Sequence, residues 1–124
     1  MPNVIKFGGG TSLELLWENP NPTSAITSPI TVNMDMTKYD RVFVSLKPAA
    51  NANEPILVEH LPNSNWVSVH TYADTWMSYR RFTRNDTQFS IGTDSGYVYH
   101  DGGHASGGQY AIPVAVYGSN GINV

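Results

Sequence analysis

Residues 30–36 read ITVNMDM, and this stretch decides the fold. Every second residue from Ile30 to Met36 is apolar, and the residues between them are polar. Because successive side chains of a β-strand point to opposite faces, this spacing predicts a strand with one buried and one solvated face. Residues 41–47, RVFVSLK, repeat the alternation, with the apolar residues at the even positions expected to point inward.

The same spacing of two recurs along the rest of the chain, and no stretch has a helical period. Further strands are predicted at 56–61, 66–72, 76–83, 88–91, 96–100 and 111–117, with turns at 38–40, 63–65 and 84–86 and polar loops at 48–55 and 101–109. Frequent Gly, Pro, Asn and Asp between short strands are typical of an all-β fold. We expect an antiparallel β-sandwich, jelly-roll-like, with about eight strands.

The closing strand, 111–117, contains a proline. Pro113 has no backbone N–H, so we predict that this strand lies at a sheet edge or carries a bulge. Ala111 and Ala115 are predicted to face outward, where their small side chains would leave room for a close approach.

Length and composition indicate one domain. A chain of 124 residues can bury a core without cross-links, and it has no cysteine for a disulfide or a thiolate metal site. We expect residues 1–12 to be a flexible glycine-rich lead-in or tether and residues 13–124 to be a single β-sandwich domain. The chain is interpreted either as a piece of a longer protein or as a small full-length one.

Charge and hydropathy argue against two kinds of partner. The net charge is −3 and charged residues make up 14% of the chain, whereas nucleic-acid binding usually requires a basic patch. No apolar run approaches the length of a membrane span, and the first ten residues lack the pattern of a secretory signal. We therefore expect no nucleic acid and no membrane insertion.

Residues 92–96, GTDSG, superficially match the nucleophile loop of trypsin-like proteases. A serine nucleophile needs a base and an orienting acid, and this chain is too short for that fold. We predict a hairpin turn there instead. No spaced carboxylate pair stands out for glycoside hydrolysis. The expectation is a protein that is not an enzyme and has no cofactor.

His100 and His104 are candidate metal ligands in the segment HDGGH. Imidazole and carboxylate suit zinc, iron or nickel, and three copies of one histidine on a three-fold axis could bind one ion. The alternative is an exposed glycine-rich loop, because paired glycines do not hold ligands rigidly.

Arg80, Arg81 and Arg84 form a basic cluster. Consecutive strand residues point to opposite faces, so Arg80 and Arg81 do not make one patch. We expect ion pairs with acidic neighbours or between subunits, and binding of an anionic glycan or phosphate is the alternative.

Aromatic side chains are the strongest indication of a binding surface. The candidate ligand-binding residues are Trp66, His70, Tyr72, Trp76, Tyr97 and Tyr99. In the strand 66–72, inward valines would leave the face with Trp66, His70 and Tyr72 open, and flat rings can stack on sugars. Packing in the core or at a subunit interface is the alternative, because aromatic residues are abundant in both.

Several stretches, taken in order, carry a resemblance to a known family. They are LWENPNPTS (16–24), YDRVFV (39–44), RRFT (80–83), FSI (89–91) and YAIPVAVYG (110–118). The ordered set resembles a C-terminal β-domain of phage and prophage tail-fibre and minor structural proteins. Members often carry a cysteine where this chain has Ala111 and a lysine-containing closing strand where it has 114–116.

The resemblance implies a non-enzymatic virion structural domain at a fibre tip or on the particle surface, extracellular after host lysis. Such fibres are commonly trimers that meet the host, so the implied partners are a homotrimer, other virion proteins and a bacterial surface glycan or receptor. The resemblance brings no residue-level receptor site. The alternative is a monomeric carbohydrate-binding module of a larger secreted or cell-wall enzyme.

Overall fold

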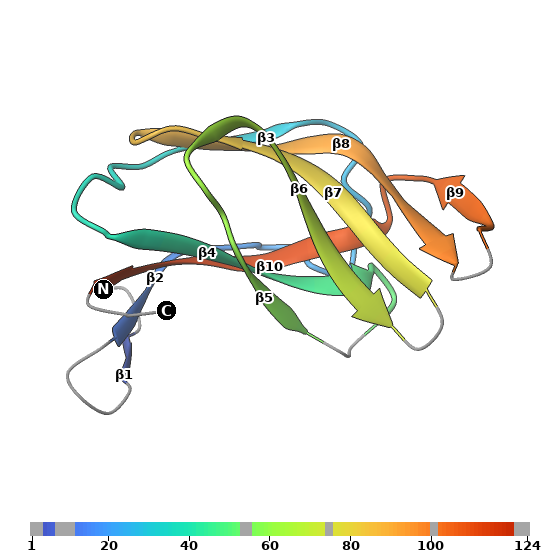
Figure 1. The fold of residues 1–124 in the computed structure, drawn as a ribbon, viewed down its shortest axis with the longest axis horizontal. Coiled ribbons are helices and arrows are strands. Elements are labelled where there is room, and N and C mark those ends of the chain that lie inside the picture. Colours follow the sequence, from blue (N-terminus) through green and yellow to red (C-terminus); the bar gives the residue numbers. More distant parts are fainter. Residues whose placement is uncertain (1–3, 7–11, 53–55, 74–75, 100–101, 121–124) are drawn as a thin grey trace.

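The computed structural model of the chain describes residues 4–6, 12–52, 56–73, 76–99 and 102–120. Within these ranges the chain forms ten strands in two antiparallel sheets, which lie as two layers (Figure 1). The predicted all-β sandwich is therefore confirmed. No helix in the described part of the chain is long and apolar enough to cross a membrane.

The first sheet has the order β1-β2-β10-β4-β5. These strands are β1 (Val4–Lys6), β2 (Ser12–Glu18), β10 (Tyr110–Asn120), β4 (Arg41–Ala49) and β5 (Leu57–His60). The second sheet has the order β3-β8-β7-β6, and β9 also pairs with β8. Its strands are β3 (Ile30–Asn33), β8 (Gln88–Tyr99), β7 (Trp76–Arg84), β6 (Ser64–Ala73) and β9 (His104–Ser106).

Strands from the two halves of the chain pair with each other, β2 with β10 and β3 with β8. By contrast, β4–β5 in the first sheet and β6–β7 in the second are antiparallel pairs of consecutive strands. The central strand of the first sheet is thus the last of the described strands. Residues 4–6, within the expected lead-in, form β1 and pair with residues 12–14 of β2.

The core lies between the sheets and follows the alternation read from the sequence. Val42, Val44 and Leu46 are fully buried on β4, and Phe89 and Ile91 face them from β8. Fully burying one such side chain stabilises the fold by roughly 1.5–3 kcal/mol. The apolar positions of the predicted strand 41–47 therefore form the centre of the core.

The predicted hairpin turn at 92–96 is wrong, because β8 runs without interruption through these residues. Arg80 pairs with Ser95 and Phe82 with Ile91, so Arg81 faces three residues of β8. This is a β-bulge, which explains why the sequence reads locally like a turn. The Ser95 hydroxyl donates to the backbone carbonyl of Gly107.

The predicted loop at 101–109 and the predicted turn at 63–65 also differ from the structure. Part of the predicted loop 101–109 is the strand β9, which pairs with β8. A side chain at Gly96 would lie 2.3 Å from the Ala105 carbonyl oxygen, so only glycine permits this pairing. The predicted hairpin turn at 63–65 is wrong, because Ser64 and Asn65 begin β6 and the chain at 61–63 crosses from the first sheet, which holds β5, to the second.

The closing strand β10 is central rather than at an edge, and its pairing with β4 is irregular after Pro113. The bulge alternative is therefore the one observed. The predicted outward orientation of Ala111 and Ala115 is wrong, since both are buried. Ala111 has a φ of 47°, a left-handed conformation that costs energy for a residue other than glycine.

Candidate functional site

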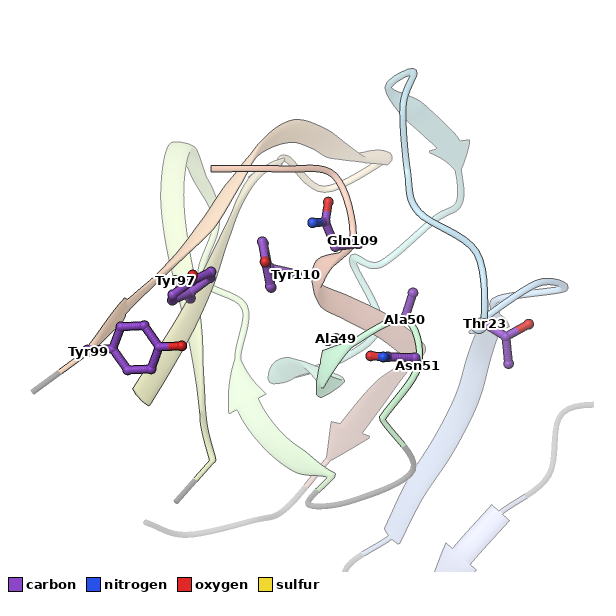
Figure 2. Close-up of a pocket in the computed structure, with 8 residues that line it drawn as sticks. All are labelled: Thr23, Ala49, Ala50, Asn51, Tyr97, Tyr99, Gln109 and Tyr110. Atoms are coloured by element: carbon purple, nitrogen blue, oxygen red, sulfur yellow. The ribbon is translucent and has the colours of Figure 1, made fainter. Parts of the chain in front are cut away.

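A pocket of about 510 Å³ opens between β8, β10 and the segment that follows β4 (Figure 2). Its described lining consists of Thr23, Ala49, Ala50, Asn51, Tyr97, Tyr99, Gln109 and Tyr110. The tyrosines lie on one side, and Thr23, Ala49, Ala50 and Asn51 lie on the other. Its volume falls within the range of small-molecule sites. We call it the tyrosine pocket.

The three tyrosines pack against one another by their edges and faces. The ring centroids of Tyr97 and Tyr99 are 4.9 Å apart at an interplanar angle of 81°, and those of Tyr97 and Tyr110 are 4.6 Å apart at 68°. Tyr99 is 40% exposed, while Tyr97 and Tyr110 are half-buried. Hydrogen bonding to Tyr99, together with burial, raises the pKa of Tyr97. The cluster is thus a preformed aromatic surface with hydroxyl groups.

The strand period explains why Tyr97 and Tyr99 meet. They are two residues apart on β8, and Tyr97 pairs with Ser78, which is fully buried. The two tyrosines therefore continue the inner face of the second sheet beyond the end of the packed core. The predicted contact residues Tyr97 and Tyr99 do line one pocket.

Hydrogen bonds hold the two sides of the tyrosine pocket in place. The Ala50 N–H donates to the Gln109 carbonyl at 2.7 Å, and the Ile26 N–H donates to the Gly108 carbonyl at 3.0 Å. The Lys47 ammonium donates to the Ala50 carbonyl at 3.1 Å. These bonds fix both walls before any ligand arrives, which reduces the entropy cost of binding.

Arg80 holds residues 108–111, next to the tyrosine pocket, through hydrogen bonds to their carbonyls. Among the described residues, its guanidinium donates to the carbonyls of Ala111 (2.9 Å), Gly92 (2.6 Å), Gly108 (2.6 Å) and Tyr110 (2.8 Å). Burial lowers the pKa of Arg80 to about 10, so it remains charged at neutral pH. The predicted acidic partner is wrong for Arg80, because its described partners are backbone carbonyls. One of them is the carbonyl of Ala111, the residue with the left-handed φ.

The other two arginines differ from Arg80. Arg81 forms the predicted ion pair with an acidic neighbour, Asp94, at 2.9 Å. Arg84 is buried at the end of β7, and burial lowers its pKa while Asp86 raises it. The three side chains therefore do not form one anion-binding patch.

The backbone register places position 76 on the same sheet face as Tyr97 and Tyr99, but not positions 70 and 72. The side chains of Trp66, His70, Tyr72 and Trp76 lie outside the described part of the structure. By register, positions 70 and 72 pair with Tyr79 and Met77, which alternate with buried Ser78. Position 76 pairs with Tyr99. Positions 70 and 72 therefore lie on the opposite sheet face from Tyr97, and Trp66 lies at a register irregularity.

The metal hypothesis remains a prediction. His100 lies outside the described residues, and His104 is an exposed residue that begins β9 opposite Val98. Among the described residues, no group of three His, Asp or Glu side chains could hold a metal ion.

Asn19, the first of two asparagines in the LWENPNPTS stretch, has a structural role. Its Nδ2 donates to the Pro113 carbonyl at 2.8 Å, and its Oδ1 accepts the Asn21 N–H at 2.9 Å. The Asn19 N–H also donates to the Val114 carbonyl at 2.9 Å. The two end stretches are thus joined in space, and Asn19 positions the loop that carries Thr23 into the pocket.

Sequence reasoning missed Thr23, Asn51, Gln109 and Tyr110 as pocket residues. Tyr110 comes close to residues 49–51 because it pairs with Ala49, more than 60 positions away in sequence. No local pattern reports such a pairing. The available signals were the presence of Tyr110 and of Thr23 in stretches already singled out.

Comparison with known protein families, curated proteins and solved structures finds no match to this chain. Tyrosine rings, amides and hydroxyls can stack on an apolar ring face and exchange hydrogen bonds with neutral polar groups.

Proposed function

We propose that this chain is a non-enzymatic β-sandwich that binds a bacterial surface glycan and serves as a structural domain of a phage or prophage virion. The tyrosine pocket is the observation that carries the proposal. A sugar ring has apolar C–H faces and a rim of hydroxyls, and the pocket is lined by the exposed ring of Tyr99 and by the amides of Asn51 and Gln109. The virion setting is supported by the resemblance of the two end stretches, which meet in β2 and β10.

In this proposal the domain sits at a fibre tip or on the particle surface, extracellular after lysis, and associates as a homotrimer with other virion proteins nearby. Three weak sites on one tip bind a repetitive surface with an avidity well above the affinity of one site. A pocket with an uncharged described lining and modest affinity is sufficient for such a role.

The binding part is tested on an array of purified bacterial surface polysaccharides. Wild-type protein is expected to bind at least one of them, and Tyr99→Ala to weaken that binding by about tenfold or more. Tyr117→Ala is the matched control, because Tyr117 is half-buried on β10 but does not line the pocket. Equal binding by wild type and Tyr99→Ala, with both folded, would remove the tyrosine pocket from the proposal.

A monomeric carbohydrate-binding module of a larger enzyme is the second candidate, since the tyrosine pocket suits it equally. Light scattering behind a sizing column separates the two. A mass three times that of the 13.6 kDa chain supports the fibre domain, and a monomer supports the module. Loss of the trimer in EDTA would make His100 and His104 the first ligands to substitute.

A further inference from the structure

We infer that the tyrosine pocket selects an uncharged sugar, a neutral hexose or N-acetylhexosamine, over uronic, sialic or phosphorylated sugars. The inference rests on the proposed glycan binding and specifies the ligand class of that same site. Three observations carry it: the chemistry of the lining, the positions of the cationic side chains and the net charge of the chain.

None of the described residues that line the pocket carries a charge. The polar groups are the Thr23 hydroxyl, the amides of Asn51 and Gln109, and the tyrosine hydroxyls. Amides and hydroxyls both donate and accept hydrogen bonds, which matches the dual character of sugar hydroxyls. The methyl groups of Ala49 and Ala50 give the opposite wall an apolar part that suits C–H groups or an acetyl methyl (Figure 2).

The cations nearest the pocket are engaged with the protein itself. Arg80 donates to the carbonyls of Gly108 and Tyr110 and is fully buried, so its charge does not reach a ligand directly. Lys47 is 5% exposed and donates to the Ala50 carbonyl. Arg81 pairs with Asp94.

The remaining described arginines lie at the far ends of their strands. Arg41 begins β4, whose other end is Ala49 at the pocket. Arg84 ends β7, whose first residue pairs with Tyr99. Eight residue steps along a strand correspond to roughly 26 Å, which exceeds the Debye length in physiological salt. Neither arginine can neutralise an anion in the pocket.

A carboxylate or phosphate entering this pocket would therefore lose water without gaining a direct partner among the described cationic side chains, which is unfavourable. The net charge of −3 also repels anionic polymers at long range. We expect at least about a tenfold preference for the neutral member of a matched pair of sugars, a factor equivalent to ~1.4 kcal/mol.

The test uses acidic bacterial polysaccharides and their carboxyl-reduced forms, in which each uronic acid becomes the neutral hexose of the same linkage. Wild type is expected to bind the reduced form more tightly, with the difference lost in Tyr99→Ala. Asn51→Arg, at an exposed lining position, is expected to shift the preference toward the native acidic form.

The outcomes separate the two ideas. Tighter binding of native acidic polysaccharides by wild type would overturn the neutral-sugar inference and leave the proposed glycan binding intact. Binding of neither form, nor of any neutral polysaccharide on the same array, would overturn both.

Discussion

Arg80 is a buried cation whose partners are neutral. A guanidinium suits this position because its planar fork presents several N–H groups in fixed directions. It extends from β7 in the second sheet to the carbonyls of Tyr110 and Ala111 on β10 in the first sheet and to Gly92 on β8. One side chain thus joins the two sheets at the base of the tyrosine pocket and holds the left-handed Ala111 in place.

Replacement of Arg80 by lysine is expected to destabilise the fold strongly. The donors of a lysine ammonium are all on one nitrogen, whereas the guanidinium carries donors on three. Lysine therefore cannot reach all the carbonyls that Arg80 reaches, and buried acceptors lose their hydrogen-bond partners. We expect a loss of about 3 kcal/mol in the free energy of unfolding, measured by urea denaturation. Arg81→Lys, next in sequence but in a partly exposed ion pair, should cost less than about 1 kcal/mol. Equal losses for the two variants would contradict the role given to Arg80.

Tyr39 makes stability depend on pH in the alkaline range. Its ring packs on Gly118, where a side chain would lie 2.5 Å from the ring, and its hydroxyl donates to Glu14 at 2.7 Å. Burial, and then the Glu14 carboxylate, raise the pKa of Tyr39 to about 12, against 10.0 for an ordinary tyrosine. Because the folded state holds this proton more tightly, the contribution is complete below pH 10 and is lost as the pH rises toward 12.

Wild type should therefore lose stability between pH 10 and 12 more steeply than Tyr39→Phe, which cannot ionise. The measurement is the free energy of unfolding at several alkaline pH values for both proteins. Parallel curves of unfolding free energy against pH for wild type and Tyr39→Phe would show that the pKa of Tyr39 is not raised in the folded state.

The junction between β2 and β10 depends on the end of β2. Asn19 is buried, and its amide bridges the Pro113 carbonyl and the Asn21 N–H. Asn19→Asp keeps the acceptor but loses the donor, and it leaves a carboxylate against a carbonyl. We expect a loss of about 2 kcal/mol, measured by thermal or urea unfolding. Asn21→Asp, at an exposed neighbour, is the control and should change stability little. An unchanged Asn19→Asp protein would show that the junction does not need this amide.

Alternation of apolar and polar residues correctly predicted the strands that have one buried and one more exposed face. The strand 41–47 is the clearest case, since the predicted inward residues Val42, Val44 and Leu46 are all fully buried. Prediction failed where pairing across the sheet overrides local signals. Gly92 and Asp94 read as a turn, but their place opposite Arg81 makes them a bulge.

The candidate site was predicted only in part for the same reason. Tyr97 and Tyr99 could be proposed from their aromatic character and their spacing on one strand. Tyr110 and Asn51 reach the tyrosine pocket only through the pairing of β10 with β4, which no local pattern encodes. Whole-molecule topology therefore decides the site.

That topology makes the last strand of the chain essential to the whole molecule. β10 lies between β2 and β4, so the first sheet cannot form until both ends of the chain are present. Its side chains Ile112 and Val116 are fully buried in the core, and Tyr110 completes the tyrosine pocket. Such pairing between distant parts of the chain also makes folding slow, in the millisecond-to-second range.

Removal of residues 109–124 is therefore expected to leave an unfolded chain, because it deletes the centre of one sheet and exposes the buried faces of β2 and β4. Removal of residues 1–11, which takes away only the edge strand β1, is expected to leave a folded domain that still binds glycan. Dispersion of amide signals in NMR spectra distinguishes the two results. A folded protein lacking β10 would mean that β2 can pair directly with β4, and the two ends would then be separable units.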